Sequence, residues 1–139
     1  MPDPFAAARA MWAADAASAA LGMRLEDLGE GSAVVSMRVR DDMVNGHDLC
    51  HGGLIASLAD SAFALACNSH GPVTVAAGFT IDLLEPARLG QVLKAHAQEV
   101  ALRGRSGLYD VTVRAGDTVI AEFRGRSRSL GARTGAGTS

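Results

Sequence analysis

Residues 44–68 read VNGHDLCHGGLIASLADSAFALACN, and this stretch decides the fold. It begins as a polar loop, passes through Gly52-Gly53 and continues as an almost wholly apolar segment from Leu54 to Cys67. The segment is rich in Leu and Ala and has a single β-branched residue, Ile55, which is a composition typical of a helix. Because so apolar a helix must be largely covered by other structure, we predict a long central helix.

One face of this predicted helix is small and polar. The residues that recur on it at helical spacing are Ser57, Asp60, Ser61 and Ala64. Asp is a poor residue inside a helix, and a carboxylate buried without a partner is costly to ionise, so that its pKa rises. A carboxylate such as Asp60 can act as a nucleophile or as a general base in acyl transfer. The alternative is that Asp60 faces solvent or pairs with an arginine.

Two glycines mark the predicted start of the helix. Gly52 and Gly53 leave their backbone N–H groups unshielded by side chains, and the first turn of a helix has unsatisfied N–H donors with a partial positive charge. A thioester carbonyl placed there would be polarised, and the oxyanion formed on attack would be stabilised. The alternative is that the two glycines form a simple tight turn.

The spacing between Gly52 and Asp60 limits how both can act on one substrate. Eight residues of helix span roughly 12 Å, so one carbonyl carbon cannot easily touch both groups of a single chain. A site that uses both must combine Gly52 of one subunit with Asp60 of another. The spacing therefore predicts a dimer.

The rest of the chain supplies elements that can surround the helix. The alanine-rich residues 5–21 predict one further helix that ends at Gly22. Apolar and polar residues that alternate along the chain predict strands at residues 23–27, 33–40, 74–84, 91–102, 108–115 and 118–129. We expect the last four strands to pair as a meander. One antiparallel sheet wrapped around the central helix, an α+β fold, accommodates all of these elements, and its exposed edges favour dimerisation.

Length and composition limit the class of protein. A chain of 139 residues with 48% hydrophobic residues predicts one domain over residues 1–130, and the Gly/Thr/Ser-rich residues 131–139 predict a disordered tail. The net charge of −2 argues against nucleic acid as a partner. No apolar run is long enough for a membrane span and no signal-peptide pattern is present. Cys50 and Cys67 occur in unrelated contexts, which predicts reduced thiols in a cytoplasmic protein.

The polar loop contains side chains that bind metals in other proteins. The cluster His47, Asp48, Cys50 and His51 lacks the Glu of a zincin helix, and no second pair of ligands follows, so we expect no metal. A nucleophilic pair of Cys50 and His51 is also disfavoured, because adjacent residues of an extended loop point apart.

Basic residues occur in two places that could bind phosphate groups. Arg105 and Ser106 lie in a turn between two predicted strands, where an arginine fork suits a phosphate. Arg124, Arg126 and Arg128 alternate along one strand, and for them a solvated outer face of the sheet is the simpler interpretation.

Several motifs taken together resemble a known family. The runs Asn45-Gly46-His47, Cys50-His51-Gly52-Gly53 and SLADSAFA at residues 57–64 are similar to those of the PaaI family of phenylacetic acid degradation proteins. The resemblance continues through residues 66–69 and along the strand pattern to about residue 129. Members of this family are hotdog-fold acyl-CoA thioesterases, so the resemblance implies a hotdog fold and thioester hydrolysis.

The resemblance also implies roles for individual residues. Asp60 matches the catalytic acid, as a nucleophile or as a base for a water molecule, and Gly52 matches the glycine whose N–H polarises the thioester carbonyl. Asn45 matches a loop amide beside the carbonyl or the lytic water, and His51 matches a residue that shapes the loop. Related thioesterases carry a Ser or Thr one turn after the acid, where this chain has Ala64.

We expect four further residues to contact the substrate, and these are Gly53, Ser61, Arg105 and Ser106. Whether the Ser61 hydroxyl takes the place of the missing hydroxyl at Ala64 is open. No cofactor or metal is expected.

The resemblance implies a cytoplasmic enzyme that hydrolyses aryl-acetyl or phenylacetyl-CoA esters, as a homo-oligomer that is a dimer or a tetramer built as a dimer of dimers. Two alternatives remain open. One is a non-catalytic acyl-CoA-binding hotdog protein. The other is an enoyl-CoA hydratase-like enzyme, in which Asp48 and His51 would form the catalytic pair.

Overall fold

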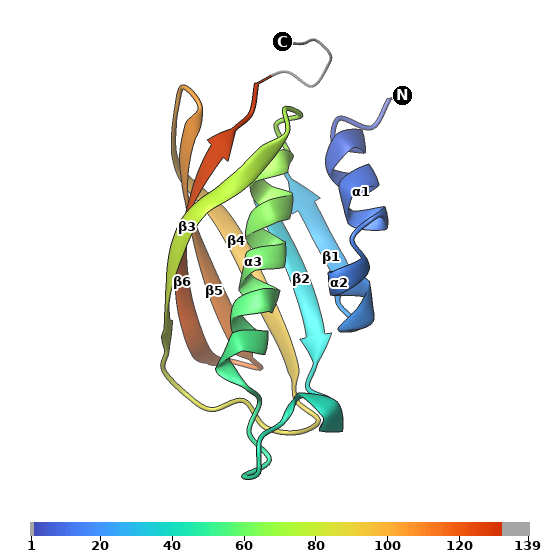
Figure 1. Cartoon of the computed structure of the whole chain (residues 1–139), viewed down its shortest axis with the longest axis vertical. Helices are drawn as coiled ribbons and strands as arrows, with labels where there is room; N and C mark the ends of the chain where they lie inside the picture. Colours follow the sequence, from blue (N-terminus) through green and yellow to red (C-terminus); the bar gives the residue numbers. More distant parts are fainter. Residues whose placement is uncertain (1, 132–139) are drawn as a thin grey trace.

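A six-stranded antiparallel sheet curves around one long helix in the computed structural model, which describes residues 2–131 (Figure 1). The helices are α1 (Ala6–Ala13), α2 (Ala16–Ala20) and α3 (Gly52–Asn68), with a 3-10 turn η1 (Asp41–Met43). The strands are β1 (Arg24–Gly29), β2 (Ser32–Arg38), β3 (Thr74–Leu83), β4 (Val92–Arg103), β5 (Ser106–Ala115) and β6 (Thr118–Ser129). The predicted central helix and the α+β class are confirmed, whereas most of the predicted tail lies outside the described residues.

The order of the strands corrects the predicted meander. The sheet runs β1-β2-β4-β5-β6-β3, so β3 pairs with β6 and not with β4. The start of β4 is fixed instead at the end of β2, because Gly90 N–H donates to the Val39 carbonyl and Val39 N–H donates to the Gln91 carbonyl. The connection from β3 must therefore cross to the other side of the sheet, which leaves β3 as an edge strand.

The N-terminal helix is also different from its prediction. Residues 5–21 form two short helices, and the second begins after Asp15, whose side chain accepts a hydrogen bond of 2.9 Å from Ser18 N–H. Asp is unfavourable inside a helix but is among the best N-cap residues, so it interrupts the alanine-rich run. Alanine content alone gave no sign of this break.

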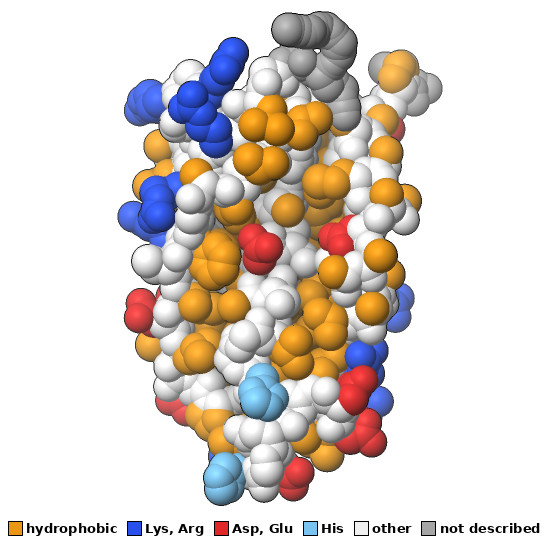
Figure 2. Space-filling view, in the orientation of Figure 1, with side chains coloured by type: hydrophobic (Ala, Val, Ile, Leu, Met, Phe, Trp, Pro, Cys, Tyr) orange, Lys and Arg blue, Asp and Glu red, His pale blue; other side chains and the backbone are white. Residues whose placement is uncertain are grey.

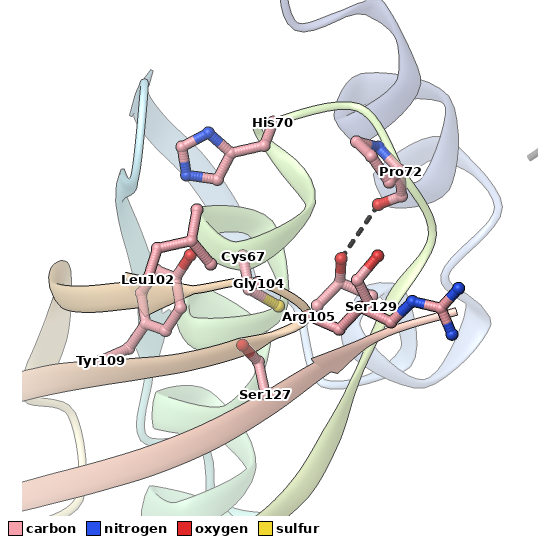
Figure 3. A pocket seen from close by; sticks show the side chains of 10 residues that line it. Cys67, His70, Pro72, Leu102, Gly104, Arg105, Tyr109, Ser127 and Ser129 are labelled. Carbon is pink, nitrogen blue, oxygen red and sulfur yellow. Dashed lines mark hydrogen bonds between the residues drawn. The ribbon is translucent and has the colours of Figure 1, made fainter. Parts of the chain in front are cut away.

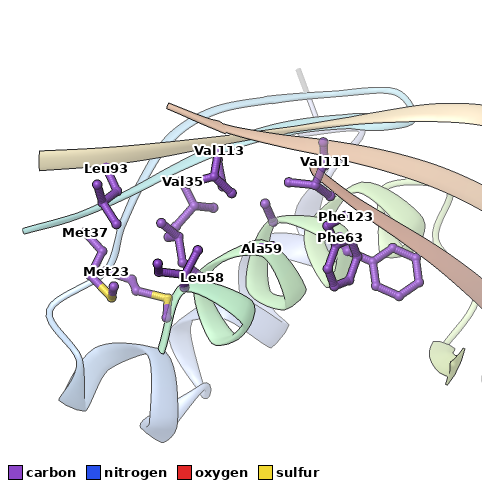
Figure 4. Packing of buried hydrophobic residues seen from close by; sticks show 14 of the residues in the cluster. Met23, Val35, Met37, Leu58, Ala59, Phe63, Leu93, Val111, Val113 and Phe123 are labelled. Carbon is purple, nitrogen blue, oxygen red and sulfur yellow. The ribbon is translucent and has the colours of Figure 1, made fainter. Parts of the chain in front are cut away.

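The core lies between α3 and the inner face of the sheet (Figure 4). The alternation that predicted one buried face of β2 is confirmed, since Val35 and Met37 are at most 1% exposed. The Phe63 ring of α3 packs against Tyr109 of β5, with ring centroids 5.6 Å apart. It also lies so close to Gly125 that a Cβ there would be 2.8 Å from its Cζ atom. The sheet is thus shaped to accept this helix.

The edge strand β3 is far more exposed than the other long strands. Val75, Phe79 and Leu83 are 43%, 42% and 52% exposed although they alternate as a buried face would. Phe79 stacks on Phe123 at 4.7 Å and covers the end of the core only partly. An unpaired edge with apolar side chains is a surface on which another strand can add.

Candidate active site

The loop before α3 is organised by the side chain of Asn45. Its Oδ1 accepts hydrogen bonds from His47 N–H at 2.8 Å and Leu49 N–H at 3.2 Å, and its own N–H donates to the Leu49 carbonyl at 2.8 Å. Because the carbonyl oxygen of the amide is used within the loop, the Nδ2 group is the part of Asn45 that remains to donate to a ligand. The tight turn places Asp48 in the left-handed region, with φ of 61°.

His51 is the N-cap of α3, and Gly52 is the first helical residue. The His51 carbonyl accepts the N–H groups of Leu54 and Ile55, and its own N–H donates to the Met43 carbonyl. Within the described residues, the N–H groups of Gly52 and Gly53 have no acceptor. The exposed His51 imidazole makes no cap bond, so this residue sets the direction of the chain with its backbone.

The two glycines have different reasons to lack a side chain. A Cβ on Gly52 would lie 2.5 Å from Leu83 Cδ1, at the end of β3, whereas a Cβ on Gly53 would meet nothing within 4 Å. A side chain at Gly52 therefore needs the exposed Leu83 side chain to shift, whereas Gly53 borders open space.

Replacing Gly53 by Ala is expected to raise the free energy of unfolding by about 0.4–1 kcal/mol. Ala has fewer conformations in the unfolded chain, is a better helix former, and finds room at this position. Urea denaturation followed by circular dichroism measures the change. The matched variant is Gly52→Ala, which should gain less because its Cβ meets Leu83. An equal gain in both variants would show that the Leu83 contact does not constrain the helix start.

Asp60 is half-buried in the middle of α3. Burial raises the pKa of its carboxyl, and the negative charge of Asp15 raises it further. No ion pair with an arginine forms among the described residues, which removes that alternative for a single chain. Figure 2 shows the face over α3 as largely hydrophobic, with isolated acidic side chains among the apolar ones and basic side chains at the margins. Apolar surroundings disfavour the ionised form of a carboxyl group, which agrees with the raised pKa of Asp60.

Ser61 is held by the N-terminal segment. Its Oγ lies 2.8 Å from Ser18 Oγ, and Ser18 Oγ donates to Asp15 Oδ2 at 2.7 Å. Since Ser18 has one hydroxyl proton and gives it to Asp15, Ser61 must donate in the bond between the two serines. The hydroxyl of Ser61 can therefore accept a hydrogen bond from a ligand but has no proton left to donate to one.

Arg105 and Ser106 lie at the opposite end of the molecule from Gly52. The turn between β4 and β5 approaches the last turn of α3, and a helix of 17 residues spans roughly 25 Å. The structure thus gives three separate groups of predicted site residues along one chain. Asn45, His51 and the glycines are at one end, Asp60 and Ser61 are in the middle, and the turn with Arg105 is at the other end.

A pocket of about 90 Å³ lies beside Arg105 (Figure 3). Its lining residues are Cys67, His70, Pro72, Thr74, Leu102, Gly104, Arg105, Tyr109, Ser127 and Ser129. The guanidinium of Arg105 extends away from Tyr109 and Cys67 in this view. Ligand pockets usually enclose at least about 300 Å³, so this pocket on a single chain is too small to bury an acyl-CoA.

Two lining residues of this pocket, His70 and Tyr109, belong to a hydrogen-bond cluster with Glu99 that the sequence did not predict. Glu99 Oε1 lies 2.6 Å from His70 Nε2 and accepts the Tyr109 hydroxyl at 2.9 Å. Burial raises the pKa of Tyr109, and it raises the pKa of the Cys67 thiol to about 12. No local pattern predicts a cluster built from three elements, and its hydrogen bonds link the end of α3 to the sheet.

The remaining side chains of the loop do not converge. Cys50 is buried, and burial raises the pKa of its thiol, whereas His47 and Asp48 are exposed. Residues 2–131 contain no group of three side chains arranged to hold a metal ion. In the same range, Asp48 and His51 share no side-chain hydrogen bond, so the pair expected of a hydratase is not assembled in one chain.

The structure thus combines a sheet wrapped around one long helix with a lone carboxylate on that helix and two glycines at its start. The Thioesterase superfamily profile matches residues 47–122, and the chain belongs to this family. The hotdog fold is therefore confirmed, as is the resemblance inferred from the motifs around Asp60. No helix in the described part of the chain is long and apolar enough to cross a membrane.

The chain is similar to several characterised or solved proteins. It is 46% identical over 125 residues to acyl-coenzyme A thioesterase PaaI of Escherichia coli strain K12, with 89% of each sequence covered. The solved structure of E. coli PaaI, from the phenylacetic acid degradation operon, has a TM-score of 0.90 at 43% identity and covers 93% of this chain and 94% of that one. The structure of smu.793 from Streptococcus mutans UA159 bound to acetyl CoA has a TM-score of 0.76 at 25% identity, covering 81% and 91%.

Proposed function

We propose that the chain hydrolyses acyl-CoA thioesters to a free acid and CoA. The observation that carries this proposal is one helix with two functional groups. These are the N–H groups of Gly52 and Gly53, which have no acceptor within residues 2–131, and the Asp60 carboxylate with its raised pKa. The likeness to acyl-coenzyme A thioesterase PaaI, over 89% of both sequences, supports the same reaction.

The reaction needs an oxyanion donor and a base or nucleophile. The Gly52 N–H would donate to the thioester oxygen and stabilise the negative charge of the tetrahedral intermediate. Asp60 would either attack the carbonyl carbon or take a proton from the water that attacks it. The intermediate then collapses, the C–S bond breaks, and CoA leaves as the thiolate. If Asp60 is the nucleophile, water then hydrolyses the anhydride that it has formed with the acyl group, which releases the acid and restores Asp60. A raised pKa makes Asp60 a stronger base than an exposed Asp.

The complete site is a shared one. Gly52 and Asp60 lie on one straight helix roughly 12 Å apart, so a single chain supplies two half-sites. The unpaired edge of β3, with Val75 and Phe79 exposed, supplies a surface for a second copy of the chain. We therefore propose a homodimer as the smallest active unit, and a tetramer would be a pair of such dimers.

An aryl-acetyl group, such as phenylacetyl, is the proposed acyl group, because the E. coli relative belongs to a phenylacetic acid degradation operon. A panel of phenylacetyl-CoA, hydroxyphenylacetyl-CoA and straight-chain acyl-CoA esters, with detection of free thiol, tests both the reaction and the preference. Tight binding of every ester without thiol release would instead identify a non-catalytic binding protein. Hydration of an enoyl-CoA without thiol release would identify a hydratase.

Replacing Arg105 by Ala is expected to raise KM for the CoA ester by up to roughly fivefold and to leave kcat almost unchanged. Exposed ion pairs contribute up to about 1 kcal/mol, and the exposed Arg105 guanidinium at the pocket rim makes no ion pair within residues 2–131 that would compete with a CoA phosphate. Steady-state kinetics at low and high salt measure the effect, which should shrink as salt screens the charge.

The matched control for this variant is Arg103→Ala. Arg103 lies in the same turn, but its Nη1 donates to the Leu102 carbonyl at 3.0 Å, so it is held against its own strand. Equal changes of KM in the two variants would remove Arg105 from the CoA-binding residues.

A further inference from the structure

A chain of hydrogen bonds joins the N-terminal segment to α3 at the residue next to Asp60. The Asp15 carboxylate caps α2 through Ser18 N–H at 2.9 Å and accepts the Ser18 hydroxyl at 2.7 Å, and Ser18 in turn contacts Ser61 at 2.8 Å. Ser18 is only 3% exposed, so this contact is shielded from water. Asp15 and Ser18, which take no direct part in the proposed reaction, are thereby linked to the residue next to Asp60.

The direction of these hydrogen bonds follows from proton counting. A carboxylate only accepts, so Ser18 gives its hydroxyl proton to Asp15, and Ser61 gives its proton to Ser18. The chain therefore points from α3 toward Asp15, and the negative charge at its end holds each hydroxyl in one orientation. Charge-assisted hydrogen bonds of this kind are stronger than neutral ones.

Few other ionisable groups face Asp60. Cys67 interacts with it along α3, but burial keeps this thiol neutral, as it does the Tyr109 hydroxyl of β5. Arg9 of α1 is engaged in an exposed ion pair, and the strands turn buried apolar side chains toward α3. Among the described residues, Asp15 is thus the charged group that acts on Asp60.

We propose that Asp15 is a positioning residue of the active site: through Ser18 and Ser61 it fixes the start of α2 against α3 and keeps a negative charge beside Asp60. The proposal rests on the proposed function, in which Asp60 is the base or nucleophile. The charge of Asp15 disfavours the ionised form of Asp60 and so raises its pKa, after the larger effect of burial. Asp60 is active as the carboxylate, so activity falls as the pH drops through this raised pKa.

The test is the pH dependence of kcat/KM in Asp15→Asn. Asn is as good an N-cap as Asp, so α2 should remain capped while the charge is lost. The acidic limb of the profile is expected to move to lower pH, because Asp60 then ionises more easily. Asp117→Asn, in the exposed turn between β5 and β6, makes the same change of charge away from this contact and should keep the wild-type profile.

A second measurement does not depend on turnover. The carboxyl carbon of Asp60, identified by its loss in Asp60→Asn, is titrated by 13C NMR in the wild type and in Asp15→Asn. The same titration midpoint in both proteins would overturn the proposal, and a lower midpoint in Asp15→Asn would support it. If the wild type released no thiol from any acyl-CoA, the proposed function would fail while this titration still decided the role of Asp15.

The hydrogen-bonded part of the proposal is tested by Ser18→Ala, which keeps the charge of Asp15 but removes the link to Ser61. We expect a lower kcat with KM nearly unchanged. The acidic limb of the pH profile should have its midpoint at a higher pH than in Asp15→Asn. Wild-type kcat in a Ser18→Ala protein would show that the link does not position the site. Rescue by Ser18→Thr, which restores a hydroxyl, separates the hydrogen bond from packing.

Discussion

Exchange of Asp60 for Asn is expected to lower kcat for acyl-CoA hydrolysis by about 10²–10⁴-fold, the range for loss of a general base. Asn has nearly the same shape but neither attacks a thioester nor removes a proton from water. Asp60 lies on α3 between buried Ala59 and half-buried Ser61. We therefore expect the protein to fold without the charge of Asp60. Thiol release under substrate saturation measures kcat, and isothermal titration with a non-hydrolysable CoA thioether shows whether binding is retained.

The Asp60→Asn variant should be at least as stable as the wild type at neutral pH. Burial and Asp15 raise the pKa of Asp60 in the folded state above its value in the unfolded chain, so the folded state binds the proton more tightly. As pH rises through this window, ionisation of Asp60 therefore reduces stability, and a neutral Asn avoids that cost. A variant that lost both stability and turnover would indicate a structural role for Asp60. Full turnover in a folded variant would exclude it as the catalytic group.

The parts of the fold that follow local rules could be predicted from the sequence. The period of two along β2 and the apolar segment of α3 each depend on neighbouring residues of one element, and both appear as expected. The polar face of α3 was also recognisable, since Asp60 and Ser61 remain less buried than the residues on either side. In these elements, the period with which apolar and polar residues alternate along the chain decides which side chains are buried.

The errors arose where distant segments meet. The place of β3 at the sheet edge depends on how β4 is fixed to the end of β2, which no local pattern records. The break at Asp15 is a local exception, because the side chain of Asp15 caps α2 and bonds Ser18 only three residues further along the chain. The contact of Ser18 with Ser61 joins residues 43 positions apart, so the link to the candidate site could only be seen in the folded chain.

The same limit applies to the site as a whole. Sequence spacing alone indicated that Gly52 and Asp60 cannot serve one carbonyl from a single chain, and the straight helix Gly52–Asn68 supports this. What the spacing did not reveal is where a second chain would add. The exposed apolar residues of β3 end at Leu83, which lies against Gly52, so the edge of β3 and the glycine end of α3 are neighbours. A partner added along this edge would therefore reach the start of α3.

Exchange of Gly52 for Pro is expected to lower kcat about 10²–10³-fold, the usual loss when one oxyanion donor is removed. Pro is well accepted as the first residue of a helix, and His51 before it already has the extended backbone that Pro requires. The variant thus removes the N–H group but also adds a Cβ that meets Leu83. Gly52→Ala is the matched control, because its Cβ meets Leu83 in the same way but the N–H is retained.

Mixing two inactive proteins then tests whether the site is shared. In a hybrid of Gly52→Pro and Asp60→Asn chains, one site receives the intact Gly52 of one chain and the intact Asp60 of the other. Half of the dimers formed by random exchange are hybrids with one good site of two, so about a quarter of the wild-type activity should return. Hybrids are made by joint refolding or co-expression with two affinity tags. If each chain carried a complete site, both sites of every hybrid would be damaged and no activity would return, which would contradict the shared site.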